Sequence, residues 1–139
     1  MVPNAMFTPT NSLERLLVEA ASKPERRGEF NRALLSARVY VLGTASSQSS
    51  GGAKVGLYGI SVEGRRVIPA FTSVTRLQEY IKTPQPYVGL VGRDFLELME
   101  PDVGVVLNPA SACGKEFFPW EIEKLLTMPP LGPDRARES

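Results

Sequence analysis

The chain has 139 residues, 42% of them hydrophobic and 22% charged, which is typical of a single globular domain. Its 16 basic side chains face 15 acidic ones, and the resulting net charge of +1 lacks the excess of cations that binding to a phosphate backbone requires. We therefore expect no nucleic-acid partner.

Two residue types that carry much of protein chemistry are scarce in this chain. Histidine is absent, which excludes histidine-based acid–base catalysis and His-paired nucleophiles, and the one cysteine, Cys113, cannot form an internal disulfide. No metal or cofactor is expected, and the cysteine usage favours the cytoplasm. Residues 1–9 contain no Lys or Arg, and no apolar run approaches the roughly 20 residues that span a bilayer, so neither a signal peptide nor membrane insertion is expected.

Two helices are predicted before the first strand. Apolar residues at helical spacing follow Asn11, and Glu14 is placed to complete a capping arrangement with it. Pro24 suits the first turn of a second helix, whose apolar face extends from Phe30 to Ala37. A strand over residues 39–42 follows.

The next segment, residues 43–54, is small, polar and without pattern, so we expect a mobile loop there. Strands over 55–60 and 67–71 flank the pair Glu63-Gly64, which indicates a hairpin. Because Pro69 has no backbone N–H to donate, the second strand is expected at an edge of the sheet or at a bulge.

The second half of the chain alternates between helices and strands. Thr72-Ser73 is expected to cap a helix that ends before Pro84, and strands are predicted over 87–91 and 103–107, with a helix over 93–99 between them. A last helix opens at Pro119. This alternation favours parallel pairing, so the predicted fold is mixed α/β, with one mixed sheet of about five strands flanked by helices. Residues 1–127 are expected to form the domain and residues 128–139 a loose tail.

Residues 106–120 hold the only cysteine and the only tryptophan, with a Gly-Lys pair between them. They do not match a phosphate-binding P-loop, because Pro109 stands where its first glycine belongs and Glu116 replaces the hydroxyl residue. Cys113 has two interpretations: a thiolate activated by Lys115 alone, or a small buried side chain at a turn. The helix after this stretch carries Glu121 in its first turn, so its positive end is expected to be met by its own carboxylate.

Phe117, Phe118 and Trp120 are three large aromatic residues within four positions, interrupted by a proline. Regular periodicity cannot bury all three in one core, so at least one is expected at the surface, where it favours a docking site. The alternative is a loop that folds back and buries all of them.

Several short segments together resemble one known family. They are Phe7-Thr8-Pro9, Asn11 with Leu13-Glu14, Val39-Tyr40-Val41-Leu42, Pro69-Ala70-Phe71-Thr72-Ser73 with Arg76-Leu77, Pro86-Tyr87, Val106-Leu107-Asn108-Pro109, Gly114-Lys115-Glu116-Phe117 and Glu121-Ile122. Over about residues 7–126 the chain is similar to the N-terminal domain of the SseB family, the enhanced serine sensitivity proteins. The resemblance implies no established reaction, cofactor or catalytic residue. It implies a second domain of the same type in longer members, and a type III secretion role by family label alone.

These observations lead to a hypothesis and its alternatives. We expect a non-enzymatic module that binds an unidentified protein partner through a surface around residues 108–120, built from Asn108, Lys115, Glu116, Phe117 and Trp120. The alternative is a small-molecule or anion-binding sensor, or an enzyme, that uses Cys113 or Lys115 in a pocket at the strand ends. A homo-oligomer assembled through an exposed edge strand is the third reading.

Overall fold

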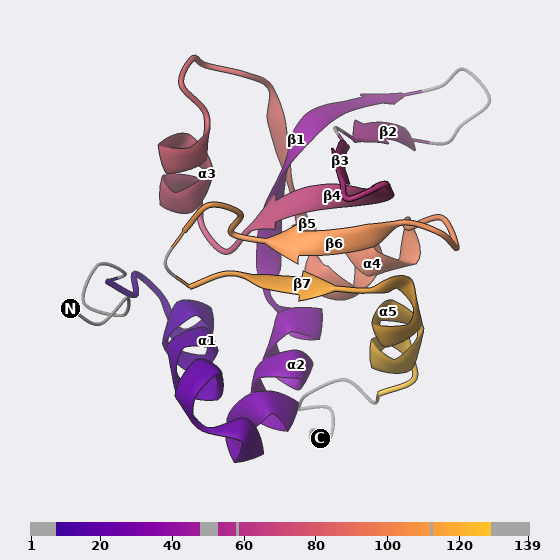
Figure 1. Cartoon of the computed structure of the whole chain (residues 1–139). Helices are drawn as coiled ribbons and strands as arrows, with labels where there is room; N and C mark the ends of the chain where they lie inside the picture. Colours follow the sequence, from indigo (N-terminus) through magenta and orange to yellow (C-terminus); the bar gives the residue numbers. More distant parts are fainter. Residues whose placement is uncertain (1–7, 48–52, 58, 112, 129–139) are drawn as a thin grey trace.

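The computed structural model describes residues 8–47, 53–57, 59–111 and 113–128 (Figure 1). The elements in chain order are α1 (Ser12–Ser22), the 3-10 turn η2 (Pro24–Arg26), α2 (Arg27–Ser36), β1 (Arg38–Ser47), β2 (Ala53–Leu57), β3 (Ile60–Val62), β4 (Arg65–Phe71), α3 (Val74–Tyr80), β5 (Tyr87–Val91), α4 (Gly92–Glu97), β6 (Gly104–Leu107), β7 (Lys115–Phe117) and α5 (Pro119–Leu126). The mixed α/β class is confirmed, as are the two helices before the first strand.

The described strands form one mixed sheet of seven, in the order β2-β1-β4-β6-β7, with β3 also paired to β4 and β5 also paired to β1. The sequence predicted about five strands. The expected strand over 55–60 divides into β2, which pairs with β1, and β3, which pairs with β4, while β7 was not predicted. Among the described strands only β4 and β6 pair in parallel, and β5 runs antiparallel to β1.

The expected loop over residues 43–54 is wrong at both ends. β1 continues to Ser47 and pairs with β2, in a register from Gly43 opposite Leu57 to Ser47 opposite Ala53. A ladder is made by backbone groups, so small polar residues continue a strand wherever a partner strand lies alongside. The middle of the expected loop, residues 48–52, lies outside the described residues.

The hairpin around Glu63-Gly64 is confirmed, and both turn residues have positive φ, 51° and 82°. This is the pairing of backbone angles that a two-residue type I′ turn requires. Pro69, however, lies in an interior strand, with β6 on one side of β4 and β3 and β1 on the other. Ala70 accepts a hydrogen bond from Asn108 on the β6 side, so the N–H that Pro69 lacks would point the opposite way. On that side of β4, the pairing with β3 ends at Val67 and the pairing with β1 begins at Ala70. Pro69 lies between these two ladders, where neither strand needs its missing N–H.

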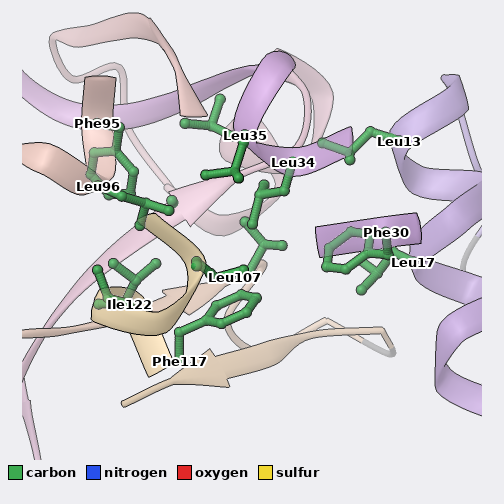
Figure 2. Close-up of a cluster of buried hydrophobic side chains, with 14 of the residues drawn as sticks. Leu13, Leu17, Phe30, Leu34, Leu35, Phe95, Leu96, Leu107, Phe117 and Ile122 are labelled. Carbon is green, nitrogen blue, oxygen red and sulfur yellow. The ribbon is translucent and has the colours of Figure 1, made fainter. Parts of the chain in front are cut away.

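The two faces of the sheet are covered unequally. Helices α1, α2, α4 and α5 share one large buried cluster with the sheet, and Figure 2 shows side chains of these helices meeting Leu107 and Phe117. On the opposite face, α3 covers a small cluster of Leu42, Phe71 and Leu77. Figure 1 shows α1 and α2 side by side, next to the β7 end of the sheet. This placement brings two helices from the start of the chain against elements from its end.

No helix within the described ranges is long and apolar enough to cross a membrane. The last described residue is Met128, whose carbonyl accepts a 2.7 Å hydrogen bond from Arg93. Residues 129–139, which hold nearly all of the expected tail, lie outside the described part of the chain.

Candidate functional site

The stretch 106–120 is not a plain strand-to-helix corner. β6 ends at Leu107, and Lys115–Phe117 form β7, which pairs antiparallel with β6. Asn108 and Ala110 have positive φ, 50° and 63°, which turns the chain sharply enough to start this return. Gly114 lies so close to the carbonyls of Leu107 and Asn108 that a Cβ there would meet them at 2.9 and 2.7 Å. The strand β7 cannot be predicted from the sequence, because three residues are too few for an alternating pattern to be recognised.

The strand β7 separates the predicted binding residues. Successive side chains of a strand point to opposite faces, so Lys115 and Phe117 share one face and Glu116 lies on the other. Phe117 is buried in the main core, with 2% of its surface exposed, and the Lys115 ammonium lies 4.9 Å from the centre of its ring. Glu116 instead forms a 2.8 Å ion pair with Arg65 of β4.

Asn108 is also inside the protein, with 1% of its surface exposed. Its side-chain oxygen accepts a hydrogen bond from the Thr72 backbone N–H at 3.1 Å, and its amide nitrogen donates to the Thr72 hydroxyl at 3.0 Å. These bonds join the ends of the parallel strands β4 and β6. In this fold Asn108 holds the corner in place rather than presenting a side chain to solvent.

A buried polar cluster occupies the carboxyl ends of these strands, where a ligand pocket was one expectation. It consists of Glu14, Thr72, Arg76 and Asn108, which are between 0% and 7% exposed. The Glu14 carboxylate accepts a hydrogen bond from the Thr72 hydroxyl at 2.6 Å and forms a 3.2 Å ion pair with Arg76. Arg76 also donates to the carbonyl of Thr8 and pairs with the exposed Glu79 at 3.2 Å. The cluster therefore fills this edge and ties α1 to the start of α3.

The capping arrangement predicted at Asn11 is half correct. The Asn11 side chain accepts from the Glu14 backbone N–H at 2.8 Å, but the Glu14 carboxylate accepts from the N–H of Thr10 rather than from that of Asn11. Burial raises the pKa of the Glu14 carboxyl, but the hydrogen bonds from Thr72, Thr10 and Arg76 outweigh burial and hold it below its ordinary value of 4.5. Glu14 is thus a charged group inside the protein at neutral pH.

Cys113 is 5% exposed and packs with the main hydrophobic core. Burial raises the pKa of its thiol above the ordinary value of 9.0, Arg76 lowers it, and Glu14 raises it further. Lys115, the residue expected to activate the thiol, is not among the groups that shift this pKa. The geometry is that of a small buried side chain at a turn.

Beside Cys113 and Lys115, an open groove of about 680 Å³ lies between the helical pair α1 and α2 and the segment formed by β7 and α5. Its apolar lining includes Leu17, Phe30, Phe117 and Leu125, each contributed by a different element. We call this hollow the helix–β7 groove. Its volume is within the range of about 300–1,000 Å³ that is usual for ligand sites.

The rim of the helix–β7 groove is mainly cationic. Arg27, Lys115 and Lys124 line it together with a single carboxylate, Glu121. Glu121 accepts a 2.9 Å hydrogen bond from the N–H of Phe118, so it caps α5 as predicted from the sequence. None of the three cations forms an ion pair with another residue that the structure describes.

The exposed aromatic residues predicted from the sequence are present. Trp120 is 63% exposed and lines the groove, while Phe118 is 36% exposed on a separate, smaller surface. The guanidinium of Arg65 lies 5.1 Å from the centre of the Phe118 ring and also donates to Glu116. Phe118 therefore lies beside the Arg65–Glu116 pair on that smaller surface. Of the five predicted binding residues, the structure therefore brings Lys115, Phe117 and Trp120 to one groove, with Phe117 as part of its floor.

The sequence does not mark the residues of the buried cluster as a site. Its patterns indicate a helix cap at Glu14 and a helix start at Thr72, and no motif assigns a role to Arg76. All three nevertheless belong to the short segments on which the family resemblance depends, as does Asn108. Segments separated by about 60 positions along the chain meet in space here.

Comparisons with known proteins agree with these segments. A family model described as the SseB protein N-terminal domain matches residues 13–124. The chain is 36% identical over 122 residues to proteins named Protein SseB from Escherichia coli (strain K12) and from Shigella flexneri, a match that covers 84% of this chain. It spans 46% of the length of each of those relatives. No solved structure gives a significant match. The chain therefore belongs to the SseB family, in which it corresponds to the N-terminal domain.

Proposed function

We propose that this SseB-type domain is a non-enzymatic module that binds a partner protein through the helix–β7 groove. The observation that carries the proposal is Trp120, a large aromatic side chain that is 63% exposed at the edge of an apolar groove. Tryptophan is among the residues that contribute most to protein–protein affinity, and an exposed one beside a hollow is a typical anchor.

The chemistry of the groove supports binding rather than catalysis. Burial raises the pKa of the Cys113 thiol, which lowers the fraction present as the nucleophilic thiolate. Lys115 offers a cation, and the carboxylate that lines the groove with it, Glu121, accepts the N–H of Phe118 as a helix cap. Apolar lining with a cationic rim is the pattern of a recognition surface, with hydrophobic contacts at its centre and charges around it.

The test is a comparison of two variants that each remove one exposed aromatic residue. Trp120→Ser removes the proposed anchor, and Tyr87→Ser, at a 42% exposed position of β5, is the matched control. Affinity purification with the full chain as bait, followed by binding measurements with each captured protein after purification, is expected to give a partner that the wild type and Tyr87→Ser bind and Trp120→Ser does not. Equal binding by all three proteins would contradict the proposal.

A small-molecule or anion sensor is the second candidate, and the groove volume together with the cations at its rim favours it. A thermal-shift screen of metabolites separates the two functions, because a ligand that binds only the folded state raises the unfolding temperature, by an amount that grows with the logarithm of its concentration divided by its Kd. A hit that is lost in Lys115→Ala, without any protein partner that depends on Trp120, would favour the sensor.

A further inference from the structure

The residues around the helix–β7 groove indicate which kind of partner it takes, and this inference rests on the function proposed above. Two features need complementary groups at once. The rim holds Arg27, Lys115 and Lys124, and the lining is apolar.

The cations are the first feature. Arg26, Arg65 and Arg76 each form ion pairs, while the three cations of the groove form none with any described residue. The whole chain carries a net charge of only +1, so this rim is a local concentration of positive charge rather than part of a basic protein. Opposed charge across an interface speeds association and excludes partners of the wrong sign.

The apolar lining is the second feature, and together with the three cations it distinguishes between classes of acidic ligand. A fatty acid supplies an apolar chain but a single carboxylate. A polypeptide supplies several carboxylates and several apolar side chains in one molecule, so it can meet the cations and the lining together.

We propose that the helix–β7 groove binds an acidic segment of a partner polypeptide. Apolar side chains of the segment enter beside Leu17, Phe30 and Leu125, and its Asp or Glu side chains meet the cations of the rim. The chain's own residues 129–139 follow Met128 at the edge of this groove, but they contain two arginines and two carboxylates and bring no net negative charge.

Trp120 is the only tryptophan of the chain, so its fluorescence reports directly on the groove. The probes are three synthetic peptides of twelve residues, each titrated into the full chain. All three have leucine at the same positions, and the remaining positions are all Glu in the first peptide, all Gln in the second and all Lys in the third. We expect the Glu peptide to shift the emission to the blue, to bind at least tenfold more tightly than the Gln peptide, and to weaken as salt is added. The Lys peptide should not bind.

Two double variants test the role of the rim. Lys115→Glu/Lys124→Glu should weaken the Glu peptide at least tenfold, whereas Arg66→Glu/Lys82→Glu, which makes the same change of charge at exposed positions outside the groove, should leave its affinity within twofold. Circular dichroism and the unfolding temperature are measured for each variant to check that it is folded.

Several outcomes would overturn the inference. They are equal binding of the Glu and Gln peptides, equal effects of the two double variants, tighter binding of dodecanoate than of the Glu peptide, and peptide binding only after residues 129–139 are removed. The last outcome would make the chain's own end the occupant. If the affinity purification above gives a partner that depends on Trp120 but not on Lys115 or Lys124, the proposed function stands and the acidic segment is rejected.

Discussion

Glu14 is the residue whose structural role departs most from its apparent role in the sequence. As the fourth residue of an Asn-x-x-Glu pattern it has the spacing of a helix cap, yet its carboxylate is completely buried and pairs with Arg76. Removing one partner of a buried ion pair strongly lowers the free energy of unfolding, because the other charge stays buried without a partner.

We therefore expect Glu14→Gln to destabilise the domain by about 3 kcal/mol, near the low end of the usual range for such a change, because Arg76 keeps its pair with Glu79. Glu79→Gln is the control, since Glu79 is 58% exposed and its removal should change the free energy of unfolding by less than about 1 kcal/mol. Urea unfolding at pH 7 measures both. Similar effects of the two variants would show that the buried pair is not a main source of stability.

The lowered pKa of Glu14 also predicts how stability depends on pH. A carboxyl group whose pKa is lower in the folded state stabilises the fold fully above its unfolded value of 4.5, and this contribution disappears as pH falls through the folded value. The free-energy difference between wild type and Glu14→Gln should thus stay constant from pH 7 to about pH 5 and narrow below pH 4.5. A difference that stays unchanged down to pH 3 would mean that Glu14 titrates normally.

Cys113 should react slowly. Each unit by which a thiol pKa rises lowers the thiolate fraction about tenfold below that pKa, and burial restricts access as well. We expect alkylation by iodoacetamide at pH 8 to be at least about tenfold slower in the native protein than in urea. Equal rates in the two states would restore the hypothesis of a reactive thiol.

At the scale of elements, β7 determines what the stretch 106–120 can do. Its three residues place Phe117 in the core, Lys115 at the groove and Glu116 against Arg65. A single short strand therefore divides one cluster in the sequence between the interior and two surfaces.

Substitutions within β7 should have sharply different effects. Phe117→Ala removes a 2% exposed aromatic ring and should lower the free energy of unfolding by about 3–5 kcal/mol. Lys115→Ala, two residues earlier on the same face, should change it by no more than about 0.5 kcal/mol. Denaturant unfolding of the two variants checks the contrast. A mild effect of Phe117→Ala would indicate that β7 does not pack as described.

For the molecule as a whole, the sheet connects the two ends of the described chain. α1 and α2 pack in the same core as α5, and Arg93 holds the carbonyls of Leu126 and Met128 at 3.2 and 2.7 Å. We propose that residues 1–127 form the folding unit, as the sequence suggested.

A chain that ends at Met128 should unfold at the same urea concentration and with the same slope as the full chain, because the slope follows the surface that unfolding exposes. A chain that ends at Pro119 should fail to fold, since it lacks the buried Ile122 and Leu125 of α5. A lower slope for the chain that ends at Met128 would show that residues 129–139 contribute to the folded structure.

Much of the fold was predictable because its signals are local. Helical spacing after Asn11, the Glu63-Gly64 turn and the proline that opens α5 each act within a few residues of chain, and all three are confirmed. The family could also be recognised from separate short segments. The extension of β1 and the strand β7 could not be predicted, because their residues become strands only where a neighbour pairs with them.

The sequence by itself determined the fold class and the absence of histidine chemistry, and it left two alternatives for the aromatic residues 117, 118 and 120, exposure of at least one or burial of all. Only the tertiary structure decided that Asn108 and Phe117 are buried, that Lys115 and Trp120 share a groove, and that Glu14 meets Arg76. The physical reason is that composition and periodicity act along the chain, whereas burial and ion pairing depend on residues brought together from distant positions. The candidate site consists almost entirely of such contacts.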